Sequence, residues 1–129
     1  MWTDLAAIHA ASFTNPAPWS ARDLQSAAES PGAFLLCEDQ AFLIGRAIAG
    51  EAELLTLATH PDARRRGIGA RLVAGFLARA AETADTAFLE VAADNAGAIR
   101  LYTAHGFGKA GLRRRYYGPV DALVMRCPL

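Results

Sequence analysis

Two strand-like segments in the middle of the chain flank one long amphipathic segment, and this order constrains the fold more than any other feature. Apolar residues recur about every fourth position through residues 67–83, which predicts a helix with one buried face. The flanking residues 52–59 and 86–93 are mostly apolar and predict strands. A helix between two strands of one sheet implies a parallel crossover, which we place between Leu54–Thr59 and Phe88–Ala92.

The rest of the chain predicts antiparallel strands and further helices around this unit. Two apolar runs on either side of Glu38–Gln40 are typical of a hairpin over residues 33–50, and residues 107–129 predict two more antiparallel strands. The further helices are expected over residues 3–13, 20–30 and 95–105, with Ser20 and Asp23 at capping-box spacing and Gly106 as the last helix's C′ residue. The expected fold class is α/β (α+β), with a mixed, mostly antiparallel sheet whose central strand pair is parallel and flanked by helices.

The composition fits one compact domain over residues 1–129, and we expect this domain to be cytoplasmic. The chain is 53% hydrophobic with thirteen basic and thirteen acidic side chains, so no global field favours nucleic acid or an anionic membrane, and an anion site must be local. No apolar stretch is long enough to cross a bilayer, and the N-terminus lacks the features of a signal peptide. Cys37 and Cys127 are expected to be buried, reduced thiols, and the histidines His9, His60 and His105 to be structural or solvent-facing.

Residues 64–72, RRRGIGARL, are the strongest candidate for such a local anion site. A dinucleotide fingerprint would need a third glycine where Leu72 stands, and a P-loop would need Gly-Lys-Ser/Thr, so both are excluded. What remains is a short turn after a strand, with backbone amides opening a helix at Gly67, where a phosphate group is favoured. Arg64–Arg66 would supply counter-charge. The alternative is a helix start with a solvated basic face.

Arg64–Gly69 fits the Arg/Gln-x-x-Gly-x-Gly/Ala signature of the GCN5-related N-acetyltransferases, and the chain resembles that family, most of all its RimI-type alanine N-acetyltransferases, over residues 16–126. The other matching positions are Pro18-Trp19-Ser20, Leu89-Glu90-Val91, Asn95, Ala98-Ile99, Leu101-Tyr102, Gly106-Phe107 and Arg113–Tyr117. The family usually begins with a β-strand. Because this chain starts almost directly in a helix, the first edge strand is missing or too short to recognise.

The resemblance implies acetyl-CoA as co-substrate, no metal, and the N-terminal alanine of a small-subunit ribosomal protein as acceptor. Cofactor-binding residues are then expected at Leu57, Ala58, Thr59, Arg64, Arg65, Arg66, Gly67, Ile68, Gly69, Ala70 and Asn95. Leu57–Thr59 would supply a backbone N–H to the developing oxyanion. Asn95 can also serve as a helix N-cap. Acceptor-binding residues are expected at Trp19, Tyr116 and Tyr117, although alternation also allows Arg113–Arg115 and the tyrosines to form a plain exposed strand.

Glu90 and Tyr102 are the candidates for proton transfer. In a strand Glu90 shares a face with Phe88 and Ala92, and in that apolar setting desolvation would raise its carboxyl pKa and suit it to act as a general base. The alternatives are a glutamate facing water or a partner for a nearby arginine. An α-amine titrates near ~8 and lysine near ~10.4, so an N-terminus needs only a modest base. Tyr102 would be the general acid by resemblance, whereas its helical spacing from Ile99 by itself favours core packing.

Two other functions stay open. One is the same fold and co-substrate with a small-molecule amine or a lysine side chain as acceptor. The other is a non-catalytic acyl-CoA-binding or ribosome-binding module, against which both proton-transfer candidates argue. We expect a monomer or weak dimer, with no direct nucleic-acid or membrane partner.

Overall fold

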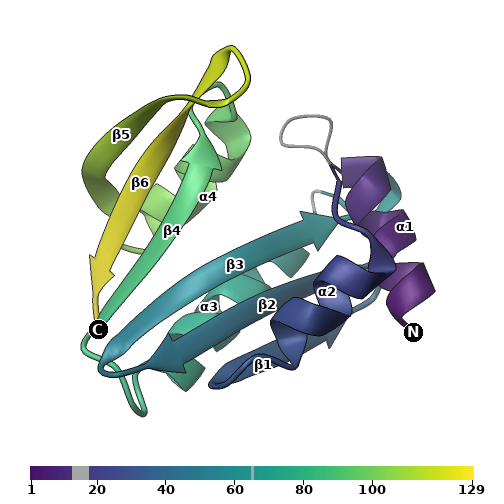
Figure 1. Ribbon diagram of the computed structural model, residues 1–129, viewed down its shortest axis with the longest axis horizontal. Coiled ribbons are helices and arrows are strands. Elements are labelled where there is room, and N and C mark those ends of the chain that lie inside the picture. Colours follow the sequence, from purple (N-terminus) through teal and green to yellow (C-terminus); the bar gives the residue numbers. More distant parts are fainter. Residues whose placement is uncertain (13–17, 65) are drawn as a thin grey trace.

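The computed structural model describes residues 1–12, 18–64 and 66–129, and its helices and strands follow the expected order (Figure 1). The elements are α1 (Trp2–Ser12), α2 (Ala21–Ala28), β1 (Ala33–Glu38), β2 (Ala41–Ile48), β3 (Glu51–Thr59), the 3-10 helix η1 (Pro61–Ala63), α3 (Ile68–Ala80), β4 (Thr86–Ala92), α4 (Ala96–Ala104), β5 (Gly108–Tyr117) and β6 (Val120–Pro128). The expected end of the first helix at Phe13 and most of the break after it lie outside the described residues. No helix in the described ranges is long and apolar enough to span a bilayer.

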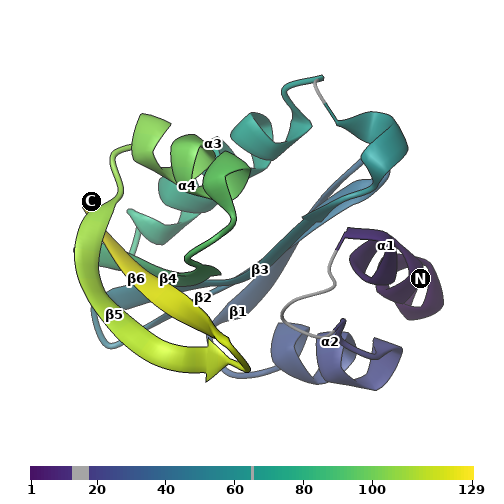
Figure 2. The same cartoon turned by 90° about the horizontal axis from the view of Figure 1, so that it is seen from above.

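The six strands form one mixed sheet in the order β1-β2-β3-β4-β6-β5, and only β3 and β4 run parallel. This confirms the expected fold class. Figure 2 shows α3 and α4 on one face of the sheet and α1 and α2 on the other. In the described part of the chain α1 is the first element.

Each helical layer buries its own apolar cluster against the sheet. The larger cluster, under α3 and α4, includes Phe76, Val73 and Leu89, none of which is more than 1% exposed. The smaller cluster, under α1 and α2, is built around Leu24 and Phe42. Because apolar side chains point to both faces of β2 and β3, this half of the sheet is covered on both sides and forms a firm base for the loops at its edge.

The two central strands pair over a shorter and earlier stretch than the sequence suggests. Glu51–Leu54 pairs in parallel with 86–89, which confirms the expected crossover, but of the stretches 54–59 and 88–92 only Leu54 and Leu89 are partners. The cause lies on the opposite edge of β3, where Thr56 pairs with Ile44 and Leu54 with Gly45, so that Leu55 is left over as a β-bulge. A bulge bends its strand, and beyond it β3 and β4 diverge, as Figure 1 shows.

Local signals place most element ends correctly. The Ser20–Asp23 capping box is formed in both directions, and Gly106 has a φ of +95° directly after α4. The long helix ends at Ala80 instead of about residue 83, because the chain tightens there into turns such as Thr83 N–H to the carbonyl of Ala80. Cys127 is buried as expected, but Cys37 is exposed, since it lies on β1 outside the cluster that α1 and α2 cover.

Candidate active site

A cleft of about 930 Å³ lies where β3 and β4 diverge, and it collects most of the predicted site residues. Its walls come from both helical layers, because the gap between the strands leaves the sheet open there. His9 of α1 and Trp19 line it from one layer, and Tyr102 of α4 lines it from the other. The cleft therefore passes from one face of the sheet to the other.

The start of α3 forms one wall of the cleft with uncapped backbone amides. Gly67 is the N-cap, with a φ of +73° that favours glycine, and it has no side chain to bind the N–H groups of the first turn. Gly67, Ile68, Gly69 and Ala70 all line the cleft. Because the positive end of the helix dipole lies here and the first turn has no acidic residue, the wall favours an anion.

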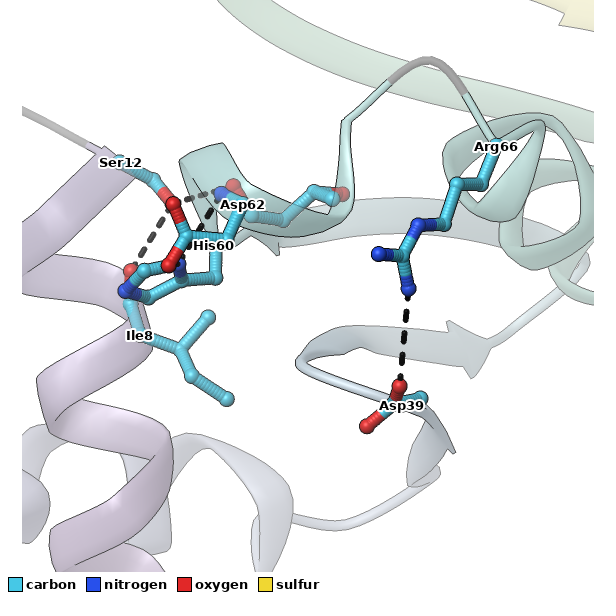
Figure 3. A network of polar contacts seen from close by, with 7 residues as sticks. Ile8, Ser12, Asp39, His60, Asp62 and Arg66 are labelled. Atoms are coloured by element: carbon cyan, nitrogen blue, oxygen red, sulfur yellow. Dashed lines mark hydrogen bonds and ion pairs between the residues drawn. The ribbon is translucent and has the colours of Figure 1, made fainter.

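The three arginines before this turn are placed differently. Arg64 lines the cleft, and Arg65 lies outside the described residues. Arg66 is turned toward the β1–β2 hairpin, where its Nη1 is 3.9 Å from Oδ2 of Asp39, as Figure 3 shows. Of the two predicted counter-charges that the structure describes, Arg64 lines the cleft and Arg66 does not.

The outer half of β3 gives a second wall. Leu57 and Thr59 line the cleft, whereas Ala58 is 2% exposed and packs in the cluster under α1 and α2. The end of β3 lies against α1, because the Ser12 hydroxyl is 2.8 Å from the carbonyl oxygen of Thr59 and 2.8 Å from that of Ile8 and can donate to either. Figure 3 shows Ser12 beside Ile8.

Asn95 lines the cleft at the start of α4 and caps that helix. Its Oδ1 accepts the backbone N–H of Ala98 at 3.1 Å. The capping role predicted from the sequence is confirmed, and the expected contact to a ligand stays a prediction. Among the described residues no three His, Cys, Asp or Glu side chains are grouped as metal ligands would be.

Glu90 lines the cleft, but its surroundings are not the apolar ones expected. Its Oε1 lies 2.9 Å from Nε of Arg113, and its side chain remains 24% exposed. Arg113 in turn lies over the ring of Tyr116, 5.3 Å from the centroid. Of the alternatives considered for Glu90, the structure therefore contains the ion pair with an arginine. The expectation of an unpaired carboxyl in an apolar setting does not apply.

Tyr102 combines the two roles that the sequence left open. Its residue is 7% exposed and its ring packs edge-on against Phe107, with 5.9 Å between centroids, so it is a core side chain. It also lines the cleft, and no hydrogen bond joins its hydroxyl to another residue in the described part of the chain. Burial, and then the neighbouring Tyr117, raise the pKa of Tyr102 above its ordinary value, so the hydroxyl is protonated at neutral pH.

His9 is a site residue that sequence reasoning missed. Its Nδ1 accepts the backbone N–H of Trp19 at 3.1 Å, its Nε2 lies 2.9 Å from Oγ1 of Thr56, and its ring stacks on Trp19 with 5.7 Å between centroids. Burial lowers the pKa of His9 to about 4, so the ring is neutral and Nε2 carries the proton. His9 thereby holds Trp19 at the cleft. A lone histidine in an alanine-rich helix offers no pattern that would have indicated this.

The predicted acceptor residues all line the cleft, and the two tyrosines form a pair. These residues are Trp19, Tyr116 and Tyr117, and the two tyrosine rings pack edge-on with 5.1 Å between centroids. Burial, together with the nearby charge of Glu90, raises the pKa of Tyr117. The cleft thus has an aromatic end beside Glu90 and an anion-favouring end at α3.

Comparison with known proteins adds to this geometry. The sequence model described as the Acetyltransferase (GNAT) family matches residues 2–107. A [Ribosomal protein bS18]-alanine N-acetyltransferase of Escherichia coli is 36% identical over 98% of this chain and 93% of its own length. A protein of the same description from Salmonella typhimurium is 42% identical over 69% of this chain and 64% of its own length. The crystal structure of the ribosomal-protein-S18-alanine N-acetyltransferase from Escherichia coli superposes with a TM-score of 0.88 at 31% identity, covering 98% of this chain and 86% of that one.

Proposed function

The chain belongs to the GNAT acetyltransferase family, and from this membership we propose that it transfers the acetyl group of acetyl-CoA to the α-amine of a protein N-terminus. The proposed acceptor is the N-terminal alanine of a small-subunit ribosomal protein. The observation that carries the proposal is the through-sheet cleft, which joins an anion-favouring helix start to an aromatic end containing Glu90. The similarity to alanine N-acetyltransferases over nearly the whole chain supports this choice of acceptor.

We assign the α3 end of the cleft to the coenzyme. The N–H groups from Gly67 to Ala70 would bind its pyrophosphate, and Arg64 would add counter-charge. The free edge of β3 after Leu54 would pair with the amide groups of the pantetheine arm, and a backbone N–H of Leu57–Thr59 would bind the oxyanion. Asn95 would contact the same arm from the start of α4. This assignment accounts for the divergence of β3 and β4, since a paired strand would leave no room for the arm.

The proposed chemistry is direct attack of the amine on the thioester. The amine nitrogen bonds to the acetyl carbon, the carbon–sulfur bond breaks, and the amine proton passes to Glu90, directly or through water. Oε1 of Glu90 binds Arg113, which leaves Oε2 to receive the proton. Because the pKa of Tyr102 is raised, full proton transfer to the thiolate would be uphill. Its hydroxyl would stabilise the departing sulfur mainly by a hydrogen bond as charge develops, and the released CoA thiolate would take its proton from water.

Glu90→Gln tests the assignment of the base. The amide keeps the shape and an oxygen for Arg113 but cannot take up a proton, so we expect turnover to fall by about a hundredfold or more with acetyl-CoA affinity unchanged. Glu53, the other carboxylate that lines the cleft, provides the comparison, and Glu53→Gln is expected to retain most of the turnover. Equal losses in both variants, or no loss in Glu90→Gln, would contradict the assignment.

The acceptor class is tested by mass spectrometry on two peptides incubated with acetyl-CoA and the protein. One peptide has the free N-terminal alanine sequence of the ribosomal protein, and the other has a blocked N-terminus and an internal lysine. We expect acetylation of the first peptide only, since an α-amine near ~8 is deprotonated far more readily than a lysine near ~10.4. Acetylation of the lysine peptide alone, or of neither peptide, would contradict the proposed acceptor.

A further inference from the structure

Arg71, in the first turn of α3, contacts two separate parts of the chain at once. Its Nε is 2.9 and 3.1 Å from the two carboxylate oxygens of Glu38, and its Nη2 is 2.9 Å from Oε1 of the same residue. Its Nη1 donates to the backbone carbonyl of Arg66 at 3.2 Å. Such a forked contact fixes the plane of the guanidinium. Glu38 therefore fixes Arg71, and Arg71 fixes the carbonyl of Arg66.

The orientation of that carbonyl determines the orientation of the next N–H. The carbonyl of Arg66 and the N–H of Gly67 belong to one planar trans peptide group, in which they point in opposite directions. Gly67 is the N-cap of α3 and lines the cleft, and because it has no Cβ it adopts its φ of +73° without strain. By holding the carbonyl, Arg71 fixes the direction of the first N–H donor of this turn.

The β1–β2 turn makes two other contacts with the same loop. The backbone N–H of His60 donates to the carbonyl of Gln40 at 2.8 Å. The neighbouring Asp39 faces Arg66, but at 3.9 Å and with both side chains more than half exposed (Figure 3). The two acidic residues of this turn thus differ in role. Glu38 acts on the backbone of the loop through Arg71, whereas Asp39 only faces a solvated side chain.

We propose that Glu38 and Arg71 are positioning residues that orient the Arg66–Gly67 peptide group for the coenzyme's pyrophosphate. The proposal rests on the proposed function above. It assigns an anionic residue a favourable effect on the binding of an anion, which is the opposite of what its charge alone would produce. This opposition in sign makes the proposal testable.

Glu38→Gln and Asp39→Asn form a matched pair, because each removes one negative charge from the same turn. Charge alone predicts tighter acetyl-CoA binding in both variants. We expect Glu38→Gln to weaken binding by about fivefold, as the loop loses its preorganisation, and Asp39→Asn to bind no more weakly than the wild type. Titration calorimetry measures both. Glu38→Gln binding as tightly as the wild type, or both variants losing affinity alike, would overturn the proposal.

Steady-state kinetics separates positioning from general damage. We expect Glu38→Gln and Arg71→Gln to raise KM for acetyl-CoA, with kcat and KM for the peptide unchanged. The double variant should be no worse than Arg71→Gln alone, because the two residues act as one unit. A double variant restored to wild-type affinity would point to plain charge compensation and refute the proposal. Exposed ion pairs contribute little to folding, so thermal melts should show all variants folded.

The affinity of the wild-type protein for acetyl-CoA distinguishes a failure of the proposed function from a failure of the positioning role. Wild-type protein that binds no acetyl-CoA would refute the proposed function and this inference with it. Wild-type binding that Glu38→Gln leaves unchanged would refute the positioning role alone.

Discussion

Gly69→Val should separate the stability of α3 from its capacity to bind the coenzyme. Gly69 is the second residue of α3, and a Cβ added there would lie 3.4 Å from Cδ2 of Leu101, an ordinary van der Waals contact. Valine is a better helix former than glycine by a few tenths of a kcal/mol. The family signature admits alanine at this position, so the test uses a β-branched side chain, whose two further methyl groups would occupy the cleft wall that a phosphate must approach. Gly67 is a poorer test site, because its positive φ strains any other residue.

The size of the expected loss follows from one hydrogen bond. A hydrogen bond to a charged group contributes about 1.5–3 kcal/mol, so losing one backbone N–H contact to phosphate should raise the Kd for acetyl-CoA by about tenfold to a hundredfold. If the first turn of α3 binds a phosphate, the variant at Gly69 should be at least as stable as the wild type and should bind the coenzyme less tightly.

Gly75→Val is the matched control within the same helix. Its added Cβ would lie 3.4 Å from Cδ1 of Leu36, but Gly75 is not among the residues that line the cleft. We expect Tm to change by no more than about 3 °C in either variant, with affinity lost in Gly69→Val only. Calorimetric titration and thermal melts measure the two effects. Equal coenzyme affinity in both variants would refute the reasoning about the first turn of α3.

Two further predictions concern buried groups at the cleft. Tyr102→Phe keeps the ring that packs on Phe107 and removes a hydroxyl that binds no other described residue, so Tm should change by no more than about 2 °C while kcat falls by about a hundredfold; an unchanged kcat would exclude Tyr102 from the chemistry. His9 has a pKa of about 4 when folded and 6.5 when unfolded, so the unfolded chain binds more protons between these values and stability should fall by about 3 kcal/mol as the pH drops from 7 to 4. Urea unfolding across that range measures the fall, and His9→Gln should flatten it; identical slopes in both proteins would contradict the burial argument.

The parts of the site that could be predicted from sequence are those encoded by neighbouring residues. The turn at Gly67 is one, because a strand, a glycine and an amphipathic helix follow one another directly. The capping role of Asn95 is another, because it depends on the next three residues. Glu90 and Tyr102 both line the cleft, but their proposed roles come from a family resemblance and stay predictions.

The parts that could not be predicted depend on contacts between distant segments. The buried ring of His9 forms a hydrogen bond with Thr56, which lies 47 positions further along the chain. No local sequence pattern encodes that contact. Glu90 lies against Arg113 because β6 and β5 follow β4 in the sheet. The bulge at Leu55 arises from the register between two strands, and each strand alone shows only apolar residues.

The bulge at Leu55 also bears on the kinetic order of the proposed reaction. Since the gap it opens in the sheet is lined from both helical layers, the coenzyme and the peptide can reach the reaction centre from opposite sides, and neither blocks the path of the other. Spent CoA can leave by its own side while the acetylated N-terminus is still bound. For a cleft open on both sides we expect a ternary complex with random order of substrate addition. The single extra residue in β3 is what opens the cleft on both sides.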